Sequence, residues 1–84
     1  MQVSVLFFAS LREVAGADAM SVNLAEHADL SVLLEALAQA LGSEAAAALQ
    51  AANVRVAVNH ALVSGPCALS DGDEIAFLPP VTGG

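Results

Sequence analysis

Apolar residues near the start of the chain recur at every second position, which is the pattern of a β-strand. Side chains of a strand point alternately to its two faces, so Val3, Val5 and Phe7 share one face. Leu6 and Phe8 fall on the opposite face. Both faces are therefore apolar toward the end of this strand. The pattern indicates either a central strand covered on both sides or a strand whose second face is an exposed docking patch.

The clearest helical pattern spans residues 31–41. Leu34, Leu37 and Leu41 are spaced at i, i+3 and i+7, so they form an apolar stripe along one side of a helix, and Leu33 widens that stripe. Ser31 is the predicted N-cap, because its hydroxyl oxygen can accept a hydrogen bond from a free N–H group of the first turn. We expect this helix to pack its leucine stripe against the apolar face of a sheet.

The other segments complete one small α+β domain. Asn59 and His60 occupy the position of a tight hairpin turn. The predicted strands cover residues 2–9, 19–24, 54–58, 61–63 and 74–78. A helical turn is predicted within 10–16, and an alanine-rich helix is predicted from its cap at Ser43 to about Ala52. This order predicts a ubiquitin-like β-grasp roll, a mixed sheet with one main helix packed across it. In that topology the first and last strands lie side by side and parallel in the middle of the sheet.

The last six residues form a predicted tail, 79–84, that follows the folded domain at 1–78. Two consecutive prolines have fixed φ angles and cannot continue a sheet, so they favour an extended exit from the last strand. Six extended residues reach about 20 Å, at ~3.3–3.6 Å each, which is enough to enter an active site on another protein. This flexible Gly-Gly tail reads Pro79, Pro80, Val81, Thr82, Gly83, Gly84.

The two terminal glycines have a chemical use. Glycine has no Cβ atom, so a narrow channel admits Gly83 and Gly84, and reagents can approach the terminal carbonyl carbon from either side. A free carboxylate is a poor electrophile, whereas an acyl-adenylate carries a good leaving group and reacts with a sulfur donor to give a thiocarboxylate. The terminal carboxylate of Gly84 is therefore the candidate reactive group of the chain.

The charge of the chain argues against two classes of partner. Nine acidic residues stand against two basic ones, Arg12 and Arg55, and the net charge is −7. A nucleic-acid-binding protein needs a basic face to neutralise phosphates, and an anionic membrane surface repels such a chain. The charge suits a protein partner with a basic docking surface, which it would help to encounter.

A cytoplasmic location is expected. No apolar run approaches the ~20 residues that span a bilayer, and no signal peptide is predicted. Cys67 is the only cysteine, so no internal disulfide can form. It is predicted to be a packed thiol rather than a persulfide carrier, because its neighbours supply no positive charge to favour a thiolate. His27 and His60 lack a metal-ligand spacing with it and are interpreted as surface or turn residues, so no metal site is predicted.

Three blocks of the sequence form a specific combination. The first, LFFASLREVAG, covers residues 6–16, the second pairs Val58-Asn59 with Leu62-Val63, and the third, LSDGDEIAFLPPVTGG, covers 69–84. Together they resemble the small, sulfur-carrying subunits of molybdopterin synthase, which belong to the ubiquitin-like sulfur carriers. The resemblance covers the whole chain, and its closing block is more specific than a terminal Gly-Gly alone.

The resemblance implies a reaction sequence shared with other proteins. A ubiquitin-activating-like adenylyltransferase uses ATP to adenylate Gly84, and a persulfide on a sulfur donor protein converts it to a thiocarboxylate. The carrier then docks on the large synthase subunit, in an expected heterotetramer, and donates sulfur to cyclic pyranopterin monophosphate. Two deliveries build the dithiolene of molybdopterin. The chain itself is expected to bind no cofactor tightly and to be a sulfur-donating rather than a catalytic subunit.

A docking patch near the tail is also predicted. Phe8, Leu62 and Leu78 fall on the non-core side of their strands by alternation, and Pro80 follows them. Arg12, in the opening block, is a further candidate for the partner interface, because its guanidinium can pair with a carboxylate of a partner or of its own chain.

Three other interpretations stay open at this point. The chain can be a sulfur carrier for thiazole or cysteine biosynthesis, since those relatives share the fold and the Gly-Gly terminus. It can be a ubiquitin-like modifier attached to lysines of other proteins through Gly84, although it has no lysine of its own on which to build polymers. It can also be an interaction module with an inert tail, in which case removal of Gly84 leaves its function intact.

Overall fold

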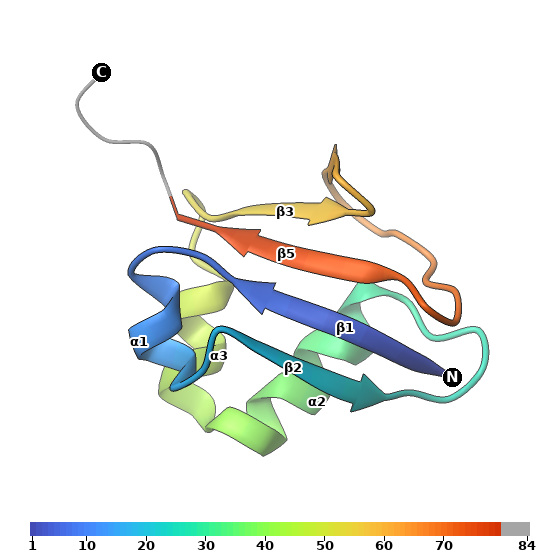
Figure 1. Ribbon diagram of the computed structural model, residues 1–84, viewed down its shortest axis with the longest axis horizontal. Coiled ribbons are helices and arrows are strands. Elements are labelled where there is room, and N and C mark those ends of the chain that lie inside the picture. Colours follow the sequence, from blue (N-terminus) through green and yellow to red (C-terminus); the bar gives the residue numbers. More distant parts are fainter. Residues whose placement is uncertain (80–84) are drawn as a thin grey trace.

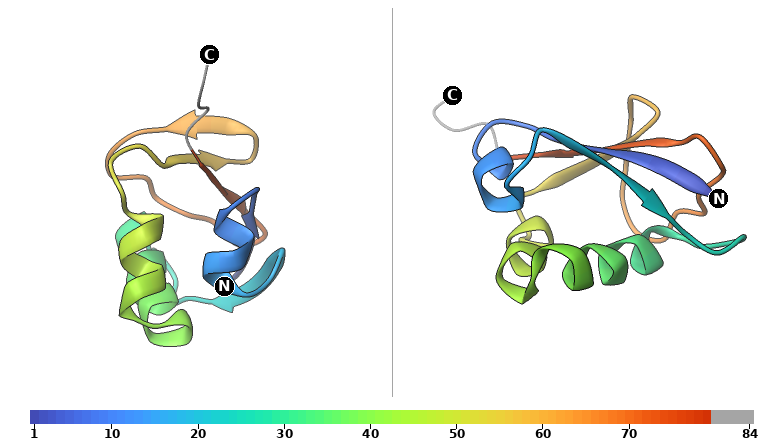
Figure 2. Two further views of the ribbon diagram at one scale, coloured as in Figure 1. Left: turned by 90° about the vertical axis from the view of Figure 1, so that its left-hand side faces the viewer. Right: turned by 60° about the horizontal axis from the view of Figure 1, so that its bottom comes forward.

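The strands of this computed structural model, which describes residues 1–79, form one five-stranded mixed sheet. The three helices lie together on one face of that sheet (Figures 1 and 2). None of these helices has both the length and the apolar surface that a bilayer span requires. In chain order the elements are β1 (Gln2–Phe7), α1 (Leu11–Ala15), β2 (Ala19–Asn23), α2 (Leu30–Leu41), α3 (Ser43–Leu49), β3 (Arg55–Val58), β4 (Ala61–Val63) and β5 (Glu74–Leu78).

The strand order is β2-β1-β5-β3-β4, and β1 and β5 run parallel at its centre. Val5 lies opposite Ile75, and Phe7 lies opposite Phe77. The pairs β1–β2, β3–β4 and β3–β5 are antiparallel. The predicted β-grasp topology is confirmed, including the parallel central pair. Because β5 is flanked on both sides, the chain leaves the domain from the most constrained part of the sheet (Figure 1).

The inward face of the central strands forms the hydrophobic core. Val5, Ile75 and Phe77 have no exposed surface, and neither do Leu33 and Leu37 of α2, which pack over them. Burial of each such side chain contributes about 1.5–3 kcal/mol. The core therefore fixes the two central strands from the same side as the helices, and leaves their second face without a helix.

Helix α2 begins one residue earlier than predicted, and its N-cap is Asp29 rather than Ser31. The Asp29 carboxylate accepts hydrogen bonds from the Val32 backbone N–H at 3.1 Å and from the Ser31 hydroxyl at 2.7 Å. The buried side of the helix is correspondingly centred on Leu30, Leu33 and Leu37. A contact with a distant segment explains the shift, because the Leu30 N–H donates to the Cys67 carbonyl oxygen at 2.9 Å.

Helix α3 differs from its prediction at both ends. It ends at Leu49, short of Ala52, and Ser43 is its first residue rather than its cap. Gly42 is at once the C-cap of α2 and the N-cap of α3, with φ 99°. The two helices meet at this single residue, so no position remains between them for a side-chain cap. A positive φ is favourable only for glycine, which explains the residue at this junction.

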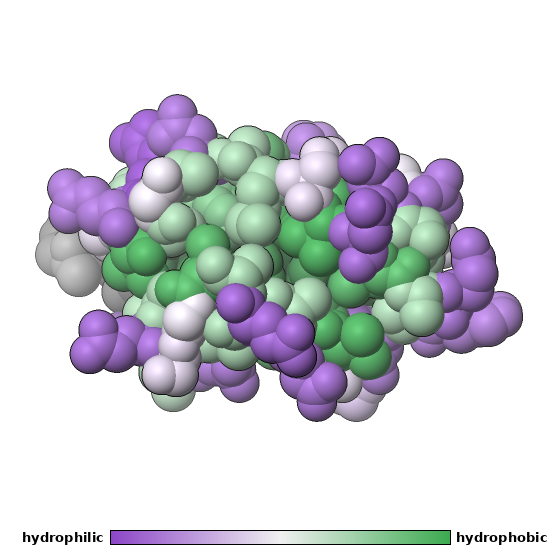
Figure 3. All heavy atoms as spheres, turned by 90° about the horizontal axis from the view of Figure 1, so that it is seen from below, coloured by the Kyte–Doolittle hydropathy of each residue, from purple (hydrophilic) through white to green (hydrophobic). Residues whose placement is uncertain are grey.

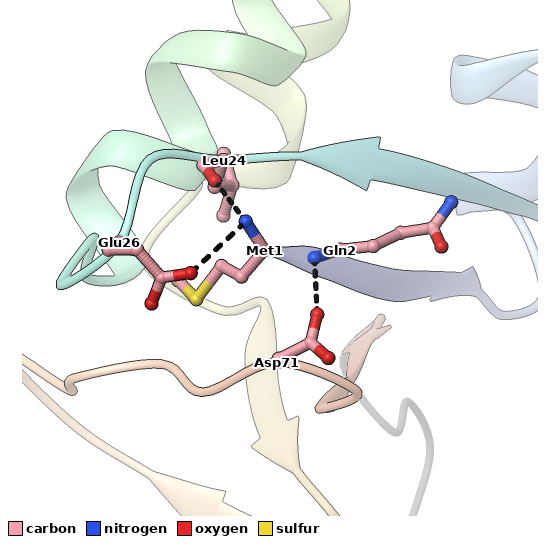
Figure 4. Close-up of polar contacts among 5 residues, drawn as sticks. All are labelled: Met1, Gln2, Leu24, Glu26 and Asp71. Carbon is pink, nitrogen blue, oxygen red and sulfur yellow. Dashed lines mark hydrogen bonds and ion pairs between the residues drawn. The ribbon is translucent and has the colours of Figure 1, made fainter.

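Three acceptors hold the start of β1 against its neighbours (Figure 4). The α-ammonium group of Met1 donates to the Leu24 carbonyl oxygen at 2.7 Å and lies 3.7 Å from the Glu26 carboxylate. The Gln2 backbone N–H donates to the Asp71 carboxylate at 2.7 Å. Asp71 thereby ties the β4–β5 connection to the first strand.

The cap of α2 predicts a specific pH dependence of stability. Hydrogen bonds to the carboxylate, first from the Ser31 hydroxyl and then from the Val32 N–H, lower the pKa of Asp29 below its ordinary value of 3.8. Because the pKa of Asp29 is lower in the folded state, the ionised cap contributes its full stability above the unfolded-state pKa of about 4. This contribution to the free energy of unfolding is lost as the pH falls through the folded-state pKa. Asp29→Ala is therefore expected to lower the Tm at pH 7, and the difference from wild type is expected to disappear in acid.

The matched control for this experiment is Glu35→Ala, which removes an exposed acid from the same helix. Its Tm difference from wild type is expected to be small and to show no comparable change with pH. Thermal unfolding followed by circular dichroism from pH 2 to pH 7 measures both variants. Equal melting temperatures of Asp29→Ala and wild type throughout that range would contradict the assigned cap.

Candidate functional site

The exit of the tail is the first part of the candidate site. The last described residue, Pro79, follows Leu78, which pairs with Arg55 of β3. On the other side of β5, the Phe8 N–H donates to the Phe77 carbonyl oxygen at 3.2 Å. The chain is thus held on both sides up to the point where the tail begins. The remaining predicted tail residues, Pro80, Val81, Thr82, Gly83, Gly84, lie outside the described residues.

A shallow hollow on the helix-free face of the sheet is the second part. Its volume is about 410 Å³. Phe8 and Leu62 both line it and have 44% and 65% of their surface exposed, so they form an exposed apolar patch rather than isolated apolar residues. The hollow, called the sheet hollow below, is lined by Leu6, Phe8, Ala57, His60, Leu62, Glu74, Ala76 and Leu78.

Small side chains at the centre of the sheet create this hollow. Ala57 of β3 lies opposite Ala76 of β5, which in turn lies beside Leu6 of β1. The two alanines leave a depression between larger neighbours, and Ala57 is only 7% exposed because those neighbours cover it. The result is an apolar floor that begins beside the tail exit and runs across three strands.

The structure brings Phe8, Leu62 and Leu78 to the same hollow, as alternation along their strands predicts. Their role in docking stays a prediction. Arg12 is not part of the sheet hollow. It lies on α1, where its Nε atom is 3.5 Å from the Ala9 carbonyl oxygen, and it lines a separate depression with Glu13 and other residues.

The polar edge of the sheet hollow was not foreseen from the sequence. His60 Nε2 lies 3.2 Å from a carboxylate oxygen of Glu74, at the opposite end of the hollow from the tail exit. His60 was predicted to lie in a turn, which is correct, and Glu74 was predicted only as the first residue of the last strand. The sequence did hold a signal for both residues. Glu74 is two and four positions before Ala76 and Leu78, and His60 is two positions before Leu62, so alternation places each on the outer face with those residues.

The other reactive side chains do not join this site. Cys67 is half-buried against the core, and its Sγ atom lies 3.7 Å from the Ala68 carbonyl oxygen. His27 lies in the connection between β2 and α2. Within residues 1–79, no group of three or more His, Cys, Asp or Glu side chains is placed to hold a metal ion. The sheet hollow and the tail exit beside it therefore make up the candidate site of the described residues.

The helix side of the molecule offers a second apolar surface for comparison. Seen from α2 and α3, apolar side chains occupy the middle of the surface and polar ones surround it (Figure 3). Val32 is the exposed large apolar residue of α2, with 38% of its surface accessible. This surface lies on the other side of the sheet from the hollow. It provides a control position for docking experiments.

Known proteins are similar to this chain both in sequence and in fold. It is 46% identical to the molybdopterin synthase sulfur carrier subunit of Escherichia coli over 85 residues, which cover 98% of this chain and 99% of that relative. The solved structure of SAMP1 from Haloferax volcanii is similar with a TM-score of 0.82 and 29% identity, over 100% of both chains. A complex of subunits 1 and 2 of molybdopterin-converting factor from Helicobacter pylori matches with a TM-score of 0.71 and 29% identity, again over 100% of both chains.

These similarities confirm the ubiquitin-like fold and the resemblance to small subunits of molybdopterin synthase that the sequence blocks predicted. The family model described as the ThiS family matches residues 5–84, which is nearly the whole chain. This protein belongs to the ThiS family.

Proposed function

We propose that this chain is the sulfur carrier subunit of a molybdopterin synthase. The observation that carries the proposal is the identity of 46% over nearly the full length with a subunit of that name. The geometry is consistent with it, because the tail leaves from a fixed central strand beside an apolar hollow. A carrier needs both features, a reactive end that reaches into a partner and a surface that holds the domain outside it.

The proposed chemistry takes place at Gly84. A carboxylate oxygen attacks the α-phosphate of ATP on the adenylyltransferase, and pyrophosphate leaves. The terminal sulfur of a persulfide on the donor protein then attacks the acyl carbon, and AMP leaves. A second thiol cleaves the resulting acyl disulfide, so that the carrier keeps a thiocarboxylate and the thiols are oxidised to a disulfide. These steps suit the cytoplasm, where ATP is present and thiols are kept reduced.

The proposed partner at the final step is the large subunit of the synthase. The Helicobacter pylori complex, in which subunits 1 and 2 of molybdopterin-converting factor are bound together, supports such a partner. The thiocarboxylate donates its sulfur to cyclic pyranopterin monophosphate, and two such deliveries complete the dithiolene. The net charge of −7 would speed encounter with a basic docking surface on either partner.

A first test follows the mass of the carrier. The protein is incubated with ATP, a persulfide donor and its cognate adenylyltransferase, and its intact mass is measured. The expected result is a gain equal to the replacement of one oxygen atom by sulfur, located at Gly84 by fragmentation. The variant that lacks Gly84 is the control and is expected to gain nothing. No mass change with an enzyme that demonstrably adenylates another carrier would contradict the proposal.

A second test addresses the docking surface. Leu62→Lys places a charge on the exposed rim of the sheet hollow, where a bound partner would have to desolvate it. We expect the Kd for the large subunit to rise at least about tenfold, as for a central interface residue. The matched control is Val32→Lys, which places the same charge on an exposed apolar residue of the helix side. This variant is expected to bind the large subunit with the affinity of the wild type. Equal affinities of the two variants would exclude the sheet hollow as the docking surface.

A protein modifier is the second candidate function. The observation that favours it is the TM-score of 0.82 with SAMP1, whose name in full is small archaeal modifier protein 1. Both functions begin with an activated Gly84, so the first test does not separate them. Isopeptide bonds between Gly84 and lysines of cellular proteins, found by mass spectrometry, would favour the modifier.

A further inference from the structure

We infer that His60 is a partner-binding residue of the docking surface, which presents its imidazole together with Glu74 to a basic side chain of the large subunit. The inference rests on the proposed function and extends it, because it assigns a polar contact and a charge to an otherwise apolar surface. It is carried by the backbone conformation of His60, by its contacts and by its place at the edge of the sheet hollow.

The backbone at His60 adopts a conformation that histidine does not favour. Asn59 and His60 form the two-residue loop between β3 and β4, with φ angles of 50° and 72°. Two positive φ angles are the pattern of a type I′ turn, in which glycine is preferred at the second position. A residue with a Cβ atom is strained there. Such strain persists where surrounding structure enforces it, and it is often found at functional sites.

The imidazole is not what holds this turn in place. Asn59 does so through three hydrogen bonds to the start of β5. Its backbone N–H donates to the Glu74 carbonyl oxygen at 2.8 Å, and its side-chain oxygen accepts from the Glu74 N–H at 3.0 Å. Its side-chain NH₂ donates to the Asp73 carboxylate at 2.9 Å. The turn is therefore anchored by its first residue, and glycine at the second would fold at least as well.

The side chain of His60 is placed for an intermolecular contact. It is 88% exposed, yet its Nε2 atom is held 3.2 Å from the Glu74 carboxylate, whose side chain is 37% exposed. Both residues line the sheet hollow together with Leu62. The pair thus forms the polar edge of the same surface whose apolar rim is proposed to dock.

The chemistry of the pair defines the group that it would bind. Nε2 of the ring lies within hydrogen-bond distance of one Glu74 carboxylate oxygen and can donate to it. An ionised carboxylate has about four acceptor sites, so Glu74 can accept further hydrogen bonds from a partner. The complementary group is a donor, and the chain's net charge of −7 favours a cationic one. An arginine or lysine of the large subunit fits this description.

The test compares His60→Gly with His27→Gly in the full-length chain. His27 also has a positive φ angle, 68°, and an exposed side chain, but it lies between β2 and α2, away from the sheet hollow. Both variants relieve backbone strain, so both are expected to keep or raise the Tm, by up to about 5 °C. Only His60→Gly is expected to weaken binding to the purified large subunit, by about 5–10-fold in Kd.

A second variant tests the pair itself. Glu74→Gln keeps the backbone hydrogen bonds of the turn and removes the charge, so it is expected to weaken binding and to reduce the dependence of Kd on salt. In the double variant, His60→Gly with Glu74→Gln, the loss of binding free energy is expected to be smaller than the sum of the losses in the two single variants, since the two side chains act together. Additive losses would overturn the paired contact.

Two further outcomes would overturn the inference. Wild-type affinity of His60→Gly with an unchanged or raised Tm would make His60 only a turn residue. A lowered Tm of His60→Gly with equal affinity would assign the imidazole to folding. Failure of the proposed function gives a different result, because wild type, His27→Gly and Val32→Lys would then all fail to bind the large subunit.

Discussion

The parallel pairing of β1 with β5 is the interaction on which the rest of the structure depends. It buries Val5, Phe7 and Phe77 in one core beneath the helices, and it places the last strand in the middle of the sheet. The point at which the chain leaves the sheet is therefore fixed by strands on both sides of β5. The same register sets Leu6 beside Ala76 on the opposite face, so the sheet hollow and the tail exit arise from one pairing.

The parts of this fold that local periodicity controls were predictable from the sequence. Alternation gave the inward and outward faces of β1 and β5, and it placed Phe8 and Leu78 on the outer face before the hollow was known. The cap of α2 was not predictable in this way, because Asp29 is fixed by a contact with the distant Cys67–Ala68 segment. The floor of the hollow depends on Ala57 and Ala76, which are far apart in sequence and meet only across strands.

Chemistry and recognition are divided between different parts of the chain. In the proposed function the reactive carboxyl group is that of Gly84, whereas ATP, the persulfide and the pterin are supplied by partners. The core fixes the position of the last strand, and we propose that the sheet hollow and its His60–Glu74 edge select the partners. A single apolar surface next to the tail would suit a carrier that visits an activating enzyme and a synthase in turn, because each partner must hold the domain while it acts on the same terminus.

Transfer of labelled sulfur from Gly84 to the pterin would establish directly that this chain is a sulfur donor. The carrier is loaded with radioactive sulfur at Gly84, purified, and mixed with the large subunit and cyclic pyranopterin monophosphate. The account predicts that the label moves into the dithiolene of molybdopterin, with two carriers consumed for each product, and that Gly84 returns to a carboxylate. Retention of the label on a carrier that binds the large subunit would contradict the account.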